Sequence, residues 1–518
     1  MTVQVPQLCV IVLVFSTLLL MLTPPSAHQL FSASAHRKAL GVSSKRNIRS
    51  DAIVEMTLHA WSGYYAAAAG HDELEPLTNT SSDRWGEIGI TPIDSIDTLL
   101  LMGLSKEYHE ARELVKQIDL GKSRKPLSFF ETTIRHLGGS LSAYAASGDT
   151  FFLHFAKGVA DGLLHSFEEP LGLPAHQTAF GNNRGSNHNL LNRYILAEVG
   201  SNQLEFRFLS KVLNDPIYRE KSERFTQFIV QTKARGWPTC PSCYTKHAPR
   251  MPHRGLWPTF ISPDGRWSGA AGYASMMDSF HEYLLKQWIL FNKRESHLLE
   301  LYEDSVEGML KYLLRYTKNG RYAFLGYYGF GFDPTMDHLA CFAPGMLALG
   351  VMHHAHDWPG RNRSFSVSDV VAVAKDLAAT CYRLYENSKC GLAPDVVEFT
   401  LDGCYQVKSS RFHLRPETVE SLFYLFRLTE DPMYQEWGWN IARAINASCR
   451  TPSGFSGVES VTMQAPDGSF PLSNRMESYF IAETLKYLFL LFSDEKVVPL
   501  DKWVLTTEGH LLPVERNS

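Results

Sequence analysis

The sequence lacks the features that usually divide a long chain into domains. Its 518 residues contain no Ser/Gly-rich or Pro-rich linker and no long run of charge beyond residue 50. A length of about 150 residues per domain would suggest three domains. Without linkers, one large domain is the better expectation. The net charge of −4 shows no basic footprint, so no nucleic-acid partner is expected.

Metal-binding motifs are scarce as well. Cys240 and Cys243 form a single CxxC motif with no second CxxC and no neighbouring pair of histidines, so zinc is not expected. No DxDxDG-type loop is present, so spacing alone predicts no calcium site. The remaining composition is that of a globular protein, with 44% hydrophobic, 20% charged and 12% aromatic residues.

The one long apolar run lies at the N-terminus, from Leu8 to Leu22. It is shorter than the roughly 20 residues of a membrane span and is followed by small residues, as in a signal peptide. Residues 1–7 contain no Lys or Arg, which is atypical of a signal peptide. Residues 1–27 are therefore expected to be a signal peptide or a short signal-anchor, and residues 28–50, polar and rich in serine, a disordered stem.

Other features agree with a secretory compartment. Asn-X-Ser/Thr triplets begin at Asn79, Asn362 and Asn446. Of eight cysteines, Cys9 lies in the apolar run, and the odd number that remains leaves at least one unpaired or intermolecular. The expected location is the lumen of the endoplasmic reticulum or Golgi, either secreted or held to the membrane through the N-terminus alone.

The most informative stretch is residues 414–425. Pro416 suits the first turn of a helix, which would place Glu417 and Glu420 on one side of that turn, ahead of an apolar rod. Arg415 stands beside them. The arrangement predicts the rim of a polar pocket, although carboxylates placed to suit the helix dipole would read the same way.

The pattern recurs, and the recurrence favours the pocket. Glu131 and Arg135 share one helix face, and Asp278 and Glu282 share another. Glu477 precedes a further apolar run. If these helix ends meet, they form an acidic, aromatic-lined cavity, which is a setting that sugar hydroxyls and sugar C–H faces require.

The chain between these stretches predicts about fourteen helices that alternate with loops, with short strand signals near residues 320–332 and 396–407. One expected helix covers residues 187–201. Such a chain favours a closed helical toroid or an open solenoid. No fixed repeat period is visible, which argues against the solenoid.

Taken together, these segments resemble class I α-1,2-mannosidases, glycoside hydrolase family 47. The matching segments keep their order through residues 51–510: HDELEP (71–76), GITPIDSIDTLLLMGL (89–104), FETTIRHLGGSLSAY (130–144), DSFHEYLLKQW (278–288), MDHLACF (336–342), RPETVESLFYL (415–425), ESYFIAETLKYLFLLFSD (477–494) and TTEGH (506–510). The resemblance implies an all-α (α/α)7 barrel with short local β-hairpins, expected over residues 51–512 with a tail at 513–518. It also implies an inverting, calcium-dependent exo-enzyme that trims α-1,2-linked mannose from high-mannose N-glycans, acting as a monomer.

Roles follow position by position from the resemblance. Glu131 looks like the catalytic acid, acting directly or through a water, and Glu417 looks like the base. Asp278 is the third catalytic carboxylate and an alternative acid. An acid must stay protonated near neutral pH, so Arg135 is expected to point to substrate or to another carboxylate and not to Glu131.

The resemblance also supplies the ion and the disulfide. Thr507 is the expected protein ligand of Ca²⁺, whose remaining ligands would be waters and sugar hydroxyls held by carboxylates such as Glu417, Glu477 and Glu483. Cys341 and Cys381 match the family disulfide. The expected substrate-binding residues are Arg135, Glu205, Asp337, His338, Asp395, Arg415, Glu420, Glu477, Tyr479 and Glu483.

This chain departs from the family pattern at several positions. Met276 stands where relatives of the endoplasmic-reticulum type carry arginine, Asp395 where Glu is usual, Tyr479 where Phe is usual, and Thr506 where Asn is usual. None of these changes removes a catalytic carboxylate. Two other hypotheses are a lectin-like relative that binds mannose glycans with little turnover, and a helical scaffold whose acidic residues lie far apart.

Overall fold

The computed structural model describes residues 46–123, 125–180, 192–237, 253–357, 364–400 and 402–516. Within these residues the long helices pack in pairs that are consecutive in sequence, except for the last pair, which joins the two ends of the chain. The pairs are α4 (Ile90–Leu101) with α5 (Ser105–Val115), α7 (Gly138–Ser147) with α8 (Thr150–Leu163), α10 (Gln203–Leu213) with α11 (Ile217–Ala234), α12 (Asp278–Leu290) with α13 (Ser296–Gly308), α14 (Ala343–Met352) with α15 (Val367–Glu386), α16 (Glu417–Thr429) with α17 (Pro432–Ser448), and α18 (Lys486–Leu491) with α3 (Ile48–Ala68).

The two helices of a pair differ in their apolar pattern. In α15, the buried residues Val370, Val373, Ala374, Leu377 and Ala378 recur at helical spacing on one face, which suits an outer helix with one side in water. In contrast, every residue of α4 and of α18 is buried. Helices that are buried all round belong in the interior of a large protein, so the first helix of each pair lines an inner ring.

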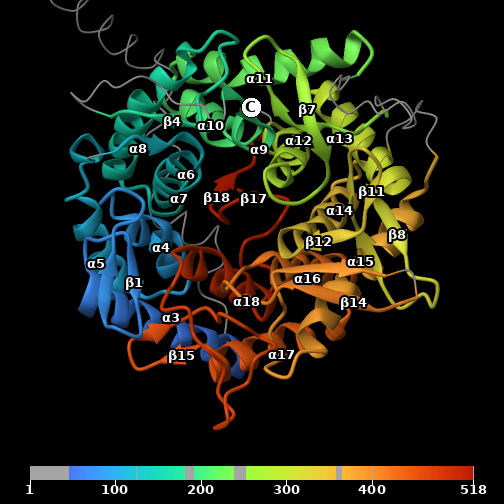
Figure 1. Ribbon diagram of the computed structural model, residues 1–518. Helices are drawn as coiled ribbons and strands as arrows, with labels where there is room; N and C mark the ends of the chain where they lie inside the picture. The colour runs from blue at the N-terminus through green and yellow to red at the C-terminus, as the bar shows by residue number, and fades with distance from the viewer. Residues whose placement is uncertain are drawn as a thin grey trace, which may run out of the picture.

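The ring closes on itself. Inner helices contact their neighbours in order from α4 to α16 and α18, and the segment before α18 contacts α4 again. Figure 1 shows this ring, with the C-terminal hairpin β17 (Trp503–Leu505) and β18 (Leu511–Pro513) at its centre. The expected all-α (α/α)7 barrel is thereby confirmed, and the missing repeat period correctly argued against an open solenoid.

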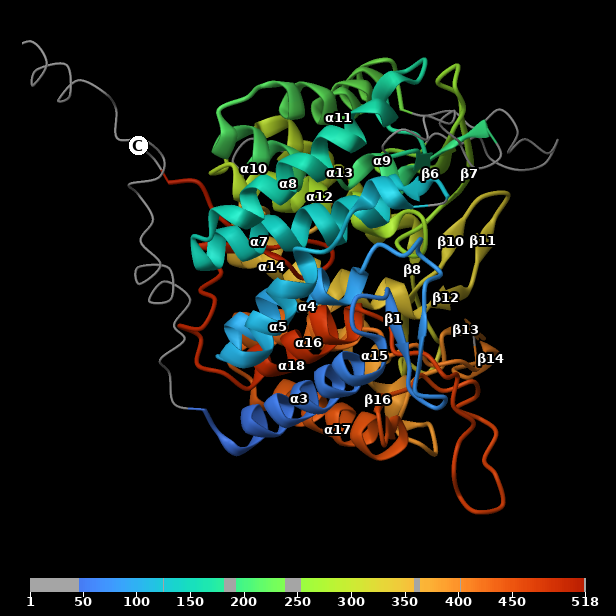
Figure 2. The same cartoon turned by 90° about the vertical axis from the view of Figure 1, so that its left-hand side faces the viewer.

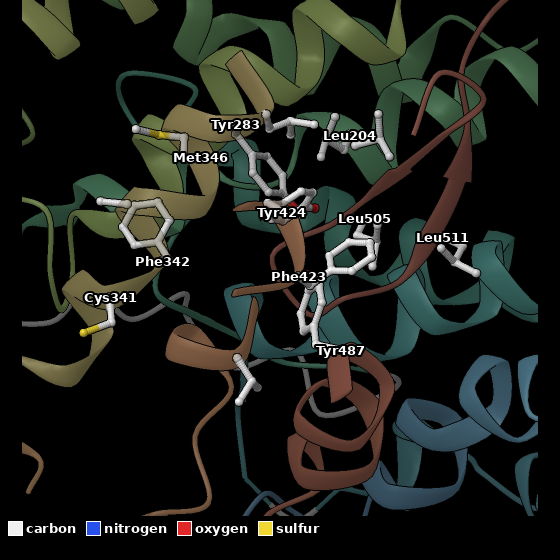
Figure 3. Packing of buried hydrophobic residues seen from close by; sticks show 14 of the residues in the cluster. Leu204, Tyr283, Cys341, Phe342, Met346, Phe423, Tyr424, Tyr487, Leu505 and Leu511 are labelled. Atoms are coloured by element: carbon white, nitrogen blue, oxygen red, sulfur yellow. The ribbon is translucent and has the colours of Figure 1, made fainter. Parts of the chain in front are cut away.

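The hairpin fills the middle of the ring with apolar side chains. Figure 3 shows Leu505 and Leu511 among Tyr283 of α12, Phe423 of α16 and Tyr487 of α18. All five residues are fully buried. The C-terminal segment is therefore part of the core and not a frayed end.

Most of the short strands lie on one side of the ring. In Figure 2 the strands β6–β8 and β10–β14 lie on one side, and the C-terminal segment reaches the hairpin from the other. The sheets pair as β11-β10-β7-β6-β5, β12-β13-β14, β1-β2, β3-β4, β8-β9, β15-β16 and β17-β18. Their bounds are β1 (Glu73–Glu75), β2 (Thr80–Ser82), β3 (Leu127–Ser128), β4 (Gln177–Thr178), β5 (Tyr194–Ile195), β6 (Pro258–Ile261), β7 (Trp267–Ala271), β8 (Leu314–Tyr316), β9 (Ala323–Leu325), β10 (Tyr327–Tyr328), β11 (Phe332–Asp333), β12 (Thr335–Asp337), β13 (Val396–Phe399), β14 (Tyr405–Ser409), β15 (Arg450–Thr451) and β16 (Gly454–Phe455).

Shorter helical segments connect these elements. Three of them have π-helical hydrogen bonding and three are 3₁₀ turns. They are α6 (Phe129–Glu131), α9 (Leu196–Gly200), the π segments η3 (Thr132–Leu137), η7 (Met309–Leu313) and η9 (Phe480–Leu485), and the 3₁₀ segments η2 (Leu120–Lys122), η4 (Leu164–Glu168) and η8 (His338–Phe342).

Several details differ from the sequence-based expectations. Helix α3 begins at Ile48, inside the expected stem, because Asn47 and Ser50 form a capping box. The described part of the helix expected over 187–201 is strand β5 followed by α9. The signal peptide or anchor, most of the stem, Asn362, Cys240 and Cys243 lie outside the described residues. None of the described helices has both the length and the apolar composition that a bilayer crossing needs.

The predicted disulfide is present between Cys341 of η8 and Cys381 of α15. It closes a loop with a sequence separation of 40 residues. Replacing both cysteines by serine is expected to lower the free energy of unfolding by about 3–4 kcal/mol, because the unfolded chain regains loop entropy. Urea unfolding of the double variant tests this value, and a loss below about 1 kcal/mol would contradict it.

Candidate active site

A cavity of about 670 Å³ opens into the ring and ends near the tip of the C-terminal hairpin. Its volume lies within the roughly 300–1,000 Å³ range of small-molecule pockets. The lining combines carboxylates, arginines and aromatic or apolar side chains. The lining residues are Arg84, Trp85, Phe130, Glu131, Ile134, Arg135, Ile195, Ala197, Glu198, Ser275, Met276, Asp278, Ser279, Glu282, Leu339, Phe342, His413, Arg415, Pro416, Glu417, Glu420, Arg475, Glu477, Tyr479, Glu483, Thr507 and Glu508.

The structure brings together most of the predicted site residues, including all three proposed catalytic carboxylates. The cavity is lined by Glu131, Arg135, Asp278, Arg415, Glu417, Glu420, Glu477, Tyr479, Glu483 and Thr507. The scaffold hypothesis required these acidic residues to lie far apart, so it is wrong. Their individual roles stay predictions.

Glu417 is the first residue of α16, directly after Pro416. The start of a helix favours a carboxylate because free backbone N–H groups point towards it. His338 lies behind Glu417, with its Nδ1 2.8 Å from Glu417 Oε2, and Nε2 of the same ring lies 2.8 Å from the Tyr385 hydroxyl. Nε2 also lies 3.1 Å from the Thr418 hydroxyl, so Tyr385 and Thr418 orient the imidazole and the imidazole orients the carboxylate.

Asp278 is the first residue of α12. One side of Asp278 faces the cavity and protein surrounds the rest of it. Burial, helped by the neighbouring charges of Asp337, Glu282 and Glu417, raises the pKa of Asp278 to about 7. A carboxyl group with this pKa holds its proton near neutral pH, which is what a general acid requires.

Glu131 has a different environment, because Arg135 contacts it. Arg135 Nε donates to Glu131 Oε2 at 2.9 Å, so the expectation that Arg135 would avoid Glu131 is wrong. The same guanidinium also reaches two other carboxylates, Asp94 at 2.8 Å and Glu508, which is the part of the expectation that holds. The spacing of four residues on one helix face decides this pairing.

Two π-helical segments shape the cavity wall. Arg135 lies in η3 and Glu483 in η9, and both side chains line the cavity. A π turn adds one residue to a helical turn and so rotates the following side chains relative to an α-helix. Such turns are frequent at functional sites, and here they aim a cation and a carboxylate into the same space.

The hairpin tip forms the floor of the cavity. Thr507 lines the cavity, and Gly509 follows with φ = +70°, where a Cβ atom would lie 3.3 Å from both Ala482 O and Glu483 Cγ. The backbone N–H of Thr506 donates to His510 O at 2.8 Å and closes the turn. Glycine is the residue that tolerates this conformation and this close approach.

A fully buried ion network fastens the tip to the inner ring. His510 bridges two carboxylates, with Nε2 3.2 Å from Asp94 Oδ1 and Nδ1 3.1 Å from Asp97 Oδ2, and Lys486 Nζ donates to Asp97 Oδ2 at 3.0 Å. Burial alone would raise the pKa of both carboxylates, but Arg135 beside Asp94 and Lys486 beside Asp97 hold their pKa values below the usual range. Because Asp94 also contacts Arg135, the floor and the wall of the cavity are linked.

The floor holds more carboxyl groups than its cations can keep ionised near neutral pH. Burial, with repulsion from Glu420 and Glu417, raises the pKa of Glu483 well above its usual value. Burial, with repulsion from Glu282 and Glu417, raises the pKa of Glu420 to about 8. Lys286 bonds to Glu282 and lies 3.9 Å from Glu420, which does not restore ordinary pKa values. A hard divalent cation prefers oxygen ligands, so this donor set fits calcium.

No group of three or more His, Cys, Asp or Glu among the described residues is arranged to bind a metal directly. The assignment of Thr507 as a direct calcium ligand stays a prediction.

Four predicted substrate-binding residues lie behind the lining and support it. Besides His338, these are Glu205, Asp337 and Asp395. Tyr283 donates to Glu205 at 2.6 Å, Tyr327 to Asp337 at 2.7 Å, and Arg415 to Asp395 at 3.2 Å. None of these four residues lines the cavity, so their place in the structure gives them a supporting role.

Sequence reasoning missed several lining residues. Glu508 lies within the segment TTEGH (506–510), which resembles the family, so the sequence did contain a signal for this residue. Glu198 pairs with His176 at 2.8 Å across the wall, and Arg84 and Trp85 reach the cavity from a loop between β2 and α4. These three residues carry no local pattern that marks a site.

Comparisons with known proteins agree with this geometry. The family model described as Glycosyl hydrolase family 47 matches residues 56–514. A human endoplasmic reticulum mannosyl-oligosaccharide 1,2-alpha-mannosidase is 38% identical over 478 residues, covering 90% of this chain and 64% of the human protein. A mannosyl-oligosaccharide 1,2-alpha-mannosidase of Arabidopsis thaliana is 39% identical over 473 residues, covering 90% of this chain and 79% of that protein.

The fold has a solved counterpart. The alpha-1,2-mannosidase from Trichoderma reesei superposes with a TM-score of 0.79 at 26% identity, covering 91% of this chain and 100% of that chain. A family match over most of the chain, relatives of similar sequence and a closely similar barrel point to one conclusion. The chain belongs to glycosyl hydrolase family 47.

Proposed function

We propose that the protein is an inverting, calcium-dependent exo-α-1,2-mannosidase that trims terminal α-1,2-linked mannose from high-mannose N-glycans. The observation that carries the proposal is the meeting of Glu131, Asp278 and Glu417 in one cavity with Thr507 at its floor. The names of the human and Arabidopsis relatives support the substrate class.

Inverting hydrolysis needs an acid on one face of the sugar ring and a base with a water on the other. Asp278 suits the acid, because burial raises its pKa to about 7. Glu417, held by His338, suits the base. Glu131 accepts a hydrogen bond from Arg135, which makes it better suited to orient a sugar or a water than to deliver the proton.

Calcium would be held by Thr507, with Glu417, Glu477 and Glu483 holding its waters. When bound, the ion supplies positive charge and coordination sites for sugar hydroxyls. Arg415 and Tyr479 line the cavity beside these carboxylates and provide a hydrogen-bond donor and an aromatic face for the terminal sugar. Trp85 offers a second aromatic face nearer the loops.

The proposed setting is the lumen of the secretory pathway, as the name of the human relative suggests. The substrate there is a glycan on a glycoprotein, and a single barrel contains the whole cavity, which supports action as a monomer.

The deciding experiment incubates the protein with a defined high-mannose glycan and calcium, and follows released mannose by proton NMR. Hydrolysis with inversion would first yield β-mannose, while retention would first yield α-mannose. Glycan binding without release would favour the lectin-like alternative and overturn the enzymatic proposal.

Removal of the metal provides a separate prediction. Dialysis against a chelator is expected to abolish mannose release and to lower the melting temperature, because an ion that binds the folded protein alone stabilises it. Added calcium should restore both properties. Full activity after exhaustive chelation would contradict the assignment of Thr507 as a ligand.

A further inference from the structure

Several cavity carboxylates follow backbone turns with a left-handed residue other than glycine. Three non-glycine residues with left-handed φ values lie two or three residues before cavity carboxylates: Met276 (+71°) before Asp278, Leu414 (+60°) before Glu417, and Asn474 (+58°) before Glu477. A left-handed conformation is costly for a residue such as leucine and persists only where the surroundings impose it. Leu414 is the most demanding case because its side chain is also fully buried.

Two hydroxyl groups impose the turn at Leu414. Thr484 Oγ1 donates to Leu414 O at 2.6 Å, and the Tyr479 hydroxyl donates to His413 O at 2.8 Å. Thr484 belongs to η9 and Tyr479 immediately precedes it. The segment that contains Glu483 therefore also donates hydrogen bonds to the carbonyls of His413 and Leu414, just before Glu417.

The rest of the turn is held from both ends. Phe412 exchanges two backbone hydrogen bonds of 2.8 Å with Val458, and Arg415 Nε donates to Asp395 at 3.2 Å. Helix α16 starts two residues after Arg415. The carbonyl of Leu414 is therefore held by a contact from η9 three residues before α16 begins.

We propose that Thr484 is a positioning residue for Glu417, acting through the strained backbone of Leu414. This inference rests on the proposed function and deepens it. Thr484 is fully buried and does not line the cavity, so it cannot act on the substrate directly. Without its hydroxyl group, the turn is free to relax towards an ordinary φ value and to shift Glu417, while the contact with Asp395 still holds the Arg415 guanidinium.

The test compares Thr484→Val, which removes the hydroxyl but keeps the shape, with Thr484→Ser, which keeps the hydroxyl. Release of mannose from a defined high-mannose glycan is measured with calcium present. Thr484→Val is expected to lower kcat about fivefold to tenfold with KM little changed, the size of effect that one hydrogen bond carries. Thr484→Ser is expected to retain at least about half of the wild-type kcat, because its hydroxyl can still hold the carbonyl.

Thr57→Val is the matched control. Thr57 is also fully buried and donates to a carbonyl, that of Ile53 in its own helix α3, at 2.9 Å. Its loss should lower the melting temperature by a similar amount without changing kcat. Adding Tyr479→Phe to Thr484→Val should lower kcat by more than the product of the two separate effects, since the two hydroxyls grip one turn.

Wild-type kcat in Thr484→Val would overturn the inference, as would an equal loss of kcat in Thr484→Ser or in Thr57→Val. These outcomes differ from a failure of the proposed function, in which the unmodified protein would itself release no mannose.

Discussion

Glu417→Gln is expected to lower kcat for mannose release by about a thousandfold, the scale on which a general base contributes. The carboxamide keeps the size of the side chain and its place at the start of α16, but it cannot take a proton from water. Because substrate contacts remain, KM should change much less than kcat. Initial rates on a defined high-mannose glycan, with mannose measured directly, give both values.

Glu398→Gln is the matched control for this change. Glu398 lies on β13, pairs with Lys408 and does not line the cavity. The control should keep wild-type kcat. Mannose release by Glu417→Gln within about tenfold of wild type would contradict the assignment of the base, since a misassigned carboxylate is the simplest explanation of so small a loss.

Local sequence patterns predicted the features of the site that depend on residues close together in the chain, such as the start of a helix or a pair of side chains on one helix face. Proline is favoured in the first turn of a helix, and the structure starts α16 at Glu417, directly after Pro416. Arg135 shows the limit of a functional argument. The four-residue spacing favoured its pair with Glu131, the expected chemistry argued against that pair, and the spacing was right.

Contacts between distant segments were beyond local patterns. The pairing of α18 with α3 closes the ring between opposite ends of the chain. The missing repeat period favoured a closed ring, but no local pattern indicated which helices would close it. The π turns at η3 and η9 are further examples, because an added residue in one turn depends on packing with neighbouring helices. Trp85 reaches the cavity through a loop whose course no periodicity describes.

Asp278→Asn should give the second large effect, again about a thousandfold lower kcat on a glycan. An acid works only while protonated. With the pKa of Asp278 raised to about 7, about half of the molecules carry the proton at pH 7 and about a tenth at pH 8. In the unmodified protein, kcat/KM should therefore fall above pH 7, about tenfold per pH unit once the pH is well above the pKa.

A substrate whose leaving group needs no proton can show whether Asp278 or Glu131 is the catalytic acid. α-Mannosyl fluoride expels fluoride without needing a proton, so Asp278→Asn should be far less impaired on this substrate than on a glycan, and the decline above pH 7 should disappear. Glu131→Gln is the comparison, and it should be impaired on both substrates. The reverse pattern, with fluoride rescuing Glu131→Gln and not Asp278→Asn, would transfer the acid's role to Glu131, because rescue by a leaving group that needs no proton identifies the residue that normally supplies one.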